Sequence, residues 1–247
     1  MDSAASGDVI AAAATPRIPV RDRAGDSIGM FPVRRIYCVG RNFADHAREM
    51  GATAPASKAD RGNPVFFMKP ADAIVIDGVV PYPPGTSDLH HEVELVVALG
   101  IDAPAGELPV SAALPLVFAY GVGLDLTRRD LQAAAKAKGL PWDTGKGFDH
   151  SAPVSDLLPA ADAGDIESLA LSLDVNGERR QQSSLDQLIW NVPDILHELS
   201  KLYALRAGDL VFMGTPAGVA ALQAGDTFDA RLGDIARLQG HIAQAAV

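Results

Sequence analysis

The segment His90-His91-Glu92-Val93-Glu94-Leu95-Val96-Val97 combines a strand-forming apolar pattern with two closely spaced carboxylates. In a β-strand, side chains two positions apart point to the same face, so Glu92 and Glu94 would lie side by side. Neighbouring carboxylates repel each other unless a positive group lies between them. A hard divalent cation, which prefers oxygen ligands, would relieve this repulsion. The alternation alone is equally compatible with an edge strand whose two glutamates face solvent.

A third carboxylate, Asp125, interrupts the apolar run of residues 121–126. A charge inside an apolar stretch requires a compensating partner. Three carboxylates from two strands would suit Mg²⁺ or Mn²⁺, although Asp125 could instead mark a strand end or a helix start. Adjacent strand residues point to opposite faces, so His90 and His91 do not favour a zinc site.

Composition excludes several classes of protein. The 247 residues are 48% hydrophobic and 21% charged, as expected for a globular protein with a sizeable core. A net charge of -10 argues against nucleic acid as a partner, because phosphate binding needs clustered Lys and Arg. The single cysteine, Cys38, excludes an intrachain disulfide. This cysteine usage fits a reducing cytoplasm, so we expect a cytoplasmic protein. No apolar run approaches the length needed to cross a bilayer, so we expect no membrane partner.

The distribution of strand and helix signals predicts an α+β fold. An alternating stretch over residues 169–175 precedes Asn176-Gly177, which is the strongest hairpin signal in the sequence. We also expect helices in which Asn42, Thr127 (with Asp130 in a capping box) and Asn191 act as N-caps. Strands are expected at 34–40, 64–68, 90–99, 116–126 and 210–213, helices at 42–50, 127–138 and 191–203, and a mobile loop at 51–64.

His46 and Glu49 lie three positions apart, on one face of the first predicted helix. A glutamate in this position can orient an imidazole and increase its basicity, so that the imidazole can deprotonate water. A pair with this spacing is, however, more commonly a surface contact.

Taken with these residues, several further blocks resemble the fumarylacetoacetate hydrolase family. They occur in the family's order and cover the chain from about Arg34 to the C-terminus. The blocks are Gly40-Arg41-Asn42, Phe67-Met68-Lys69-Pro70, Gly123-Leu124-Asp125-Leu126-Thr127, Gly139-Leu140-Pro141-Trp142 and Gly214-Thr215-Pro216-Ala217-Gly218.

The resemblance implies a fold, an assembly and a set of site residues. The fold would be a mixed β-roll, like the C-terminal domain of that family, with flanking short helices and usually a homodimer. Residues 1–30 would form an N-terminal tail and short leading segment, and residues 31–247 a single catalytic domain. The resemblance assigns metal binding (Mg²⁺ or Mn²⁺) to Glu92, Glu94 and Asp125, catalysis to His46, Glu49 and Lys146, and substrate binding to Arg41, Arg129, Gln132 and Thr215.

The implied function is metal-dependent hydrolysis of a carbon–carbon bond in a small anionic 2,4-dioxo acid. Residues 31–40, 125–132 and 145–153 look most like fumarylpyruvate hydrolases, which form fumarate and pyruvate in aromatic (gentisate) catabolism. The far carboxylate of such a substrate would need a cation, with Arg41 or Arg129 as candidates. The alternatives are an acylpyruvase or oxaloacetate decarboxylase on the same scaffold, or a non-catalytic metal-binding protein.

Overall fold

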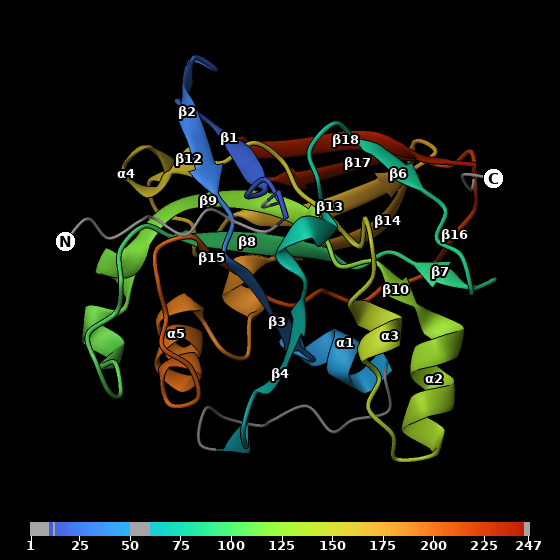
Figure 1. The fold of residues 1–247 in the computed structure, drawn as a ribbon, viewed down its shortest axis with the longest axis horizontal. Coiled ribbons are helices and arrows are strands. Elements are labelled where there is room, and N and C mark those ends of the chain that lie inside the picture. The colour runs from blue at the N-terminus through green and yellow to red at the C-terminus, as the bar shows by residue number, and fades with distance from the viewer. Residues whose placement is uncertain (1–9, 12, 50–59, 245–247) are drawn as a thin grey trace.

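The computed structural model describes residues 10–11, 13–49 and 60–244. Strand β8 (Val93–Leu99) lies at its centre (Figure 1). All seven residues of β8 are buried. The strand pairs antiparallel with β9 (Val117–Leu124) on one side and with β15 (Asp209–Phe212) on the other. The interpretation of this segment as a solvent-facing edge strand is therefore wrong.

Strand β8 belongs to a six-stranded mixed sheet. The order is β12-β9-β8-β15-β3-β4, in which only the β15–β3 pair is parallel. The remaining strands of this sheet are β12 (Leu158–Pro159), β3 (Arg35–Gly40) and β4 (Val65–Lys69). The strands predicted from the apolar runs are confirmed here, with the long run before Asp125 forming β9.

A second, five-stranded sheet covers one face of the first, and buried residues such as Leu173, Phe228 and Val97 share one core cluster. On the opposite face, Ile18 and Val20 from an N-terminal hairpin join a second cluster. Since both faces are covered, the central strands are apolar on both sides. The second sheet contains β14 (Glu178–Ser184), β13 (Ala170–Val175), β17 (Thr227–Leu232), β18 (Ala236–Ala243) and β6 (Val79–Pro81), and the hairpin contains β1 (Arg17–Arg21) and β2 (Ser27–Pro32).

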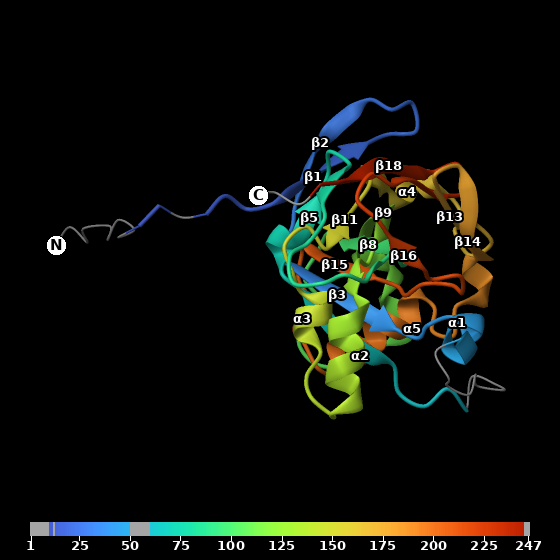
Figure 2. The same cartoon turned by 90° about the vertical axis from the view of Figure 1, so that its right-hand side faces the viewer.

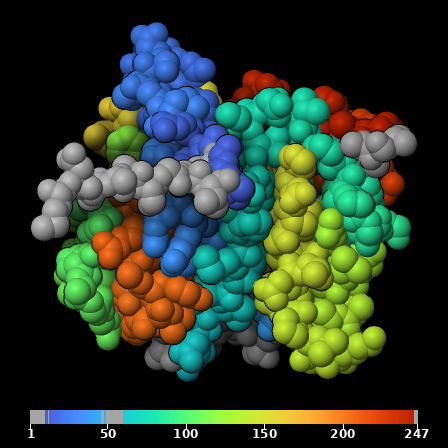
Figure 3. Space-filling model, in the orientation of Figure 1, coloured from blue at the N-terminus to red at the C-terminus, as the bar shows by residue number. Residues whose placement is uncertain are grey.

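Short helices flank the sheets, as expected for the predicted α+β roll. Helices α1, α2 and α3 lie at the same end of the molecule (Figures 1 and 2), and α2 with α3 forms one surface lobe (Figure 3). The described residues ahead of β1 run away from the body of the molecule (Figure 2). The helices are α1 (Ala44–Glu49), α2 (Arg129–Ala137), α3 (Asp143–Lys146), α4 (Ala160–Ala163) and α5 (Val192–Ser200).

Two small sheets complete the fold. One contains β10 (Thr127–Arg128), β7 (Leu89–His90) and β16 (Ala221–Leu222), and the other pairs β11 (Ala152–Pro153) with β5 (Ile74–Val75). Among the described residues, no helix has the length and apolar character needed to cross a membrane.

Two local predictions are confirmed in detail. Asn176 and Gly177 join β13 to β14 with φ values of 53° and 79°, the positive angles that a two-residue hairpin turn of this kind requires. Asn191 caps α5, because its side chain accepts a hydrogen bond from the Asp194 backbone N–H at 3.0 Å.

Two other predicted caps are wrong, because the polar groups concerned bond elsewhere. Thr127 lies in β10, and α2 begins at Arg129 without a side-chain cap. The Asp130 carboxylate instead accepts hydrogen bonds from the Thr86 hydroxyl at 2.6 Å and the Ser87 N–H. Asn42 is fully buried two residues before α1 and bonds to other loops. The loop predicted at residues 51–64 lies mostly outside the described residues.

Candidate functional site

The carboxylates of Glu92, Glu94 and Asp125 converge in the interior, with ligand oxygens that all lie within 4.8 Å of one another. Glu94 lies in β8 opposite Gly123 of β9, and Asp125 directly follows β9. Glu92 precedes β8 rather than lying within it, and its carbonyl accepts a hydrogen bond from the Asp125 N–H at 2.8 Å. The two predicted strands thus bring the three carboxylates together, although a break before Val93 divides the segment predicted as one strand.

Three cations surround these three carboxylates. Lys146 Nζ lies 2.8 Å from Glu92 Oε2 and 2.5 Å from Asp125 Oδ2. Lys69 Nζ lies 2.8 Å from Asp125 Oδ1 and donates to the Leu126 and Lys146 carbonyls. The Arg129 guanidinium pairs with Glu92 Oε1. The formal charges of the cluster therefore cancel, as burial of so many ions requires.

Glu94 is the least compensated member of the cluster. Burial raises the pKa of its carboxyl well above the usual range, and the charges of Asp125 and Glu92 raise it further. Lys146 and a 2.6 Å hydrogen bond from the Gly214 backbone N–H act in the opposite direction. This unrelieved repulsion at an all-oxygen donor set fits a hard divalent cation such as Mg²⁺ or Mn²⁺.

Lys146 stays positively charged within this cluster. Burial by itself lowers the pKa of its ammonium, but the charges of Asp125 and Glu92 and the hydrogen bonds to both outweigh that effect. The net result is a raised pKa. Lys146 therefore presents a positive charge beside two of the carboxylates.

The loop after β15 is fixed by a glycine and a buried asparagine. Gly214 has a φ of +90°, and a Cβ there would lie 2.7 Å from Asn42 Cβ and 2.9 Å from the Val39 carbonyl. Only glycine therefore allows this N–H to reach Glu94. The Asn42 amide donates to the carbonyls of Met213 (2.7 Å) and Trp190 (2.9 Å) and accepts from the Trp190 N–H.

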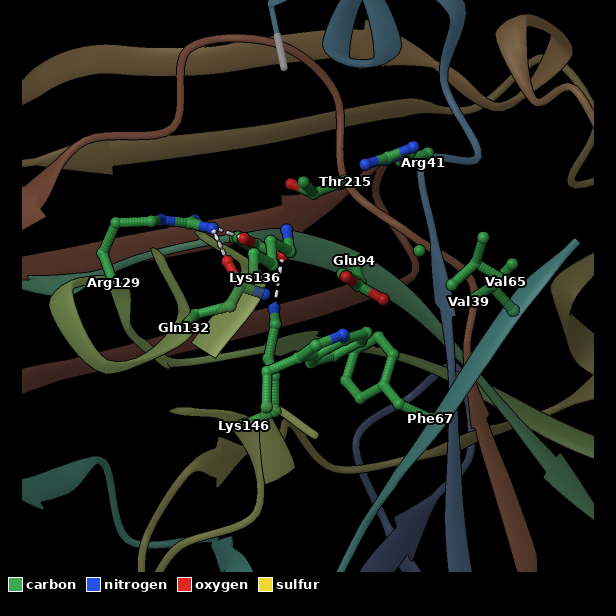
Figure 4. A pocket seen from close by; sticks show the side chains of 13 residues that line it. Val39, Arg41, Val65, Phe67, Glu94, Arg129, Gln132, Lys136, Lys146 and Thr215 are labelled. Atoms are coloured by element: carbon green, nitrogen blue, oxygen red, sulfur yellow. Dashed lines mark hydrogen bonds and ion pairs between the residues drawn. The ribbon is translucent and has the colours of Figure 1, made fainter. Parts of the chain in front are cut away.

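A cavity of about 330 Å³ opens beside the carboxylates (Figure 4). All four residues predicted to bind substrate line it, together with Lys146 and an unpredicted lysine, Lys136. Figure 4 shows Arg41 and Thr215 on one side of the cavity and Arg129 and Gln132 on another. The apolar part of the wall comes from Val39, Val65, Phe67 and Trp142.

The polar groups of the cavity are partly bonded to one another. Besides its pairing with Glu92, the Arg129 guanidinium donates to Gln132 Oε1 at 2.6 Å, so Arg129 and Gln132 are held together on helix α2. Arg41 follows β3 with a left-handed backbone (φ 58°), and its side chain reaches toward Thr215. His46 and Glu49, the predicted catalytic pair, both lie in α1. Their side chains lie outside the described part of the structure.

The buried side chain of Gln181 joins two loops of the site through hydrogen bonds, a role that the sequence did not predict. Its Nε2 donates to Thr215 Oγ1 and the Pro216 carbonyl, both at 2.8 Å. Its Oε1 accepts from the Val93 N–H at 3.1 Å and from His91 Nδ1 at 2.9 Å. Gln181 thereby ties the cavity wall at Thr215 to the start of β8. A polar residue in strand β14 offers no local signal of this role.

Comparison with known proteins identifies the family. Residues 35–243 match the fumarylacetoacetate (FAA) hydrolase C-terminal family. The chain belongs to this family. The predicted family and the mixed α+β fold are thereby confirmed.

Three enzymes of this family are similar over most of the chain. The crystal structure of fumarylpyruvate hydrolase from Pseudomonas aeruginosa, in complex with Mn²⁺ and pyruvate, superposes with a TM-score of 0.88 at 41% identity, covering 96% of this chain and 100% of that one. Fumarylpyruvate hydrolase of Ralstonia sp. is 43% identical over 70% of this chain and 89% of its own length. Oxaloacetate tautomerase of Escherichia coli (strain K12) is 40% identical over 81% and 90%.

These relatives establish the chain as an enzyme of the FAA hydrolase family. They do not support the alternative of a non-catalytic metal-binding protein. They include both hydrolases and a tautomerase, so membership of the family does not by itself specify the reaction.

Replacement of Gln181 by Leu should reduce the free energy of unfolding by about 3 kcal/mol, because each buried polar group left unpaired costs about 1–3 kcal/mol. Urea denaturation followed by circular dichroism measures this change. The same substitution at the exposed neighbour Gln182 serves as the control and should change stability by less than about 0.5 kcal/mol. Equal free energies of unfolding for the two variants would show that the hydrogen bonds of Gln181 do not stabilise the two loops that they join.

Proposed function

We propose that this enzyme hydrolyses the C3–C4 bond of a 2,4-dioxo acid in a metal-dependent reaction, with fumarylpyruvate as the preferred substrate. The observation that carries the proposal is the buried trio Glu92, Glu94 and Asp125, whose ligand oxygens converge within 4.8 Å beside a cavity lined by cations. The Pseudomonas aeruginosa relative, which contains Mn²⁺ and pyruvate, supports both the metal and the class of product.

Glu92, Glu94 and Asp125 would hold Mg²⁺ or Mn²⁺. When bound, such an ion supplies Lewis-acid chemistry, which orients a 2-oxo acid and favours enolate formation. With the ion present, the formally neutral cluster of three carboxylates and three cations would gain two positive charges. That surplus matches a substrate with two carboxylates.

The hydrolysis itself requires a base, which we assign to His46 oriented by Glu49. His46 would take a proton from a water molecule whose oxygen adds to the C4 carbonyl. The C3–C4 bond then breaks, and its electron pair moves onto the pyruvate fragment as an enolate. The Lys146 ammonium, held between Glu92 and Asp125, stabilises the negative charge that develops on this fragment. Protonation at C3 gives pyruvate, and the acyl fragment leaves as a second acid.

Two walls of the cavity would position the substrate. Gln132 and Arg129 come from helix α2, while Thr215 comes from the loop that Gln181 holds. These groups are fixed by hydrogen bonds before substrate arrives, which reduces the entropic cost of orienting the reacting atoms.

A second candidate reaction is the conversion of oxaloacetate, supported by the Escherichia coli tautomerase at 40% identity. Tautomerisation moves a proton at C3 and breaks no carbon–carbon bond. Decarboxylation releases CO₂ and also needs no attacking water. Both would use the same carboxylates and Lys146, but neither would need His46 to activate water.

A steady-state assay with fumarylpyruvate tests the proposal. We expect Mg²⁺ or Mn²⁺ to support rapid loss of the enol absorbance with equal yields of fumarate and pyruvate, and EDTA to abolish it. Metal-dependent turnover of oxaloacetate without any cleavage of fumarylpyruvate would instead favour the second candidate.

Replacement of His46 by Ala should lower kcat for fumarylpyruvate by a factor of about 10²–10⁴, the usual contribution of a general base. Mn²⁺ affinity, measured by calorimetry, should remain unchanged, because His46 is not among the proposed ligands. His241, exposed on β18, provides a matched control, and its replacement by Ala should leave kcat unchanged. Full activity of the His46 variant would disprove the proposed role of this histidine.

A further inference from the structure

Lys136 is a basic residue of helix α2 whose side chain is exposed. It lies four positions after Gln132, on the same helical face, and lines the cavity with it. In Figure 4 its side chain lies among Arg129, Gln132 and Lys146. No described carboxylate forms an ion pair with Lys136, whereas Lys146 and Arg129 are both paired with Glu92.

The surroundings of Lys136 are electropositive. Desolvation lowers the pKa of its ammonium, and the charges of Arg41, Arg129 and Lys146 lower it further, against a smaller opposing effect of Glu92. An anion bound beside Lys136 would relieve this repulsion. The cavity wall at Lys136 therefore favours an anionic ligand.

The wall beside Lys136 is aromatic. Lys136 Nζ lies 5.6 Å from the ring centroid of Trp142, and the Trp142 ring contacts Phe67 with centroids 5.1 Å apart and planes inclined by 62°. Flat aromatic surfaces favour planar, conjugated ligands. A planar unsaturated chain that ends in a carboxylate would match both the rings and the lysine.

We propose that Lys136 and Trp142 form the subsite for the distal end of the substrate, with Lys136 binding its second carboxylate. This inference rests on the proposed function, and it adds that the enzyme selects dicarboxylic over monocarboxylic dioxo acids. Of the two arginines considered from the sequence, Arg129 is already bonded to Glu92 and Gln132. Lys136 has no such ion pair among the described residues, so it can bind the far carboxylate without giving up an existing partner.

The test uses two ligands that have the seven-carbon chain of fumarylpyruvate but cannot be hydrolysed, because they lack the 4-oxo group. 2-Oxoheptanedioate carries the distal carboxylate, and 2-oxoheptanoate lacks it. Calorimetric titration of the Mn²⁺-loaded protein should show that the dicarboxylate binds at least about 10-fold more tightly, as a charge-assisted hydrogen bond predicts.

Replacement of Lys136 by Gln should remove this preference by lowering affinity for the dicarboxylate about 10-fold, with less than a twofold change for the monocarboxylate. Lys136→Arg should retain most of the preference. Lys138 follows on the same segment, is exposed and does not line the cavity, so Lys138→Gln is the matched control and should behave as the wild type.

An equal loss of affinity for both ligands, an unchanged preference in Lys136→Gln, or no preference in the wild type would each overturn the proposal. Because these ligands are not hydrolysed, the outcome is independent of turnover. A wild-type protein that prefers the dicarboxylate but does not cleave fumarylpyruvate would therefore contradict the proposed hydrolysis and leave the subsite intact.

Discussion

The structure depends on the need to neutralise three carboxylates that are buried within 4.8 Å of one another. Such a group is stable only when matching charges and hydrogen-bond donors are held in place around it. Lys69 from β4, Lys146 from α3 and Arg129 from α2 supply the charges, and the Gly214 N–H supplies a further donor. Elements that are distant in sequence therefore have to meet around β8 and β9. Helices α2 and α3 lie where they can bring Arg129 and Lys146 to the carboxylates.

The polar contacts that surround this cluster explain how loops can form a rigid site. Asn42 fixes the loop after β15 through two carbonyls, and Gln181 joins Thr215 to the backbone at Val93. Every side-chain amide group in these contacts has partners, so the network holds the loops in one arrangement. A site with this degree of preorganisation can direct its charges at a bound substrate without first reorganising. Trp142 is held separately, by the packing of its ring against Phe67.

The sequence predicts the parts of this site that carry a local signal. The alternation around Glu92 and Glu94 and the charge of Asp125 within an apolar run indicate a carboxylate cluster, and Asn176-Gly177 indicates a hairpin. Two of the failures share one physical cause, which is that a polar side chain bonds to a partner far along the chain. Asn42 bonds to Trp190 instead of capping a helix, and Gln181 reaches Val93 across 88 positions. Lys136 also escapes notice, because a lysine on an amphipathic helix looks like any other exposed charge until the cavity is seen.

We propose that the buried carboxylates form a divalent-cation site rather than a purely structural ion cluster. An anomalous difference map from crystals grown with Mn²⁺ tests it directly. We expect one strong peak within coordination distance of oxygens from Glu92, Glu94 and Asp125, with Lys146 retained beside it. A map without a peak there, in which Lys146 still bridges Glu92 and Asp125 at saturating Mn²⁺, would contradict the account and leave the cluster with a structural role only.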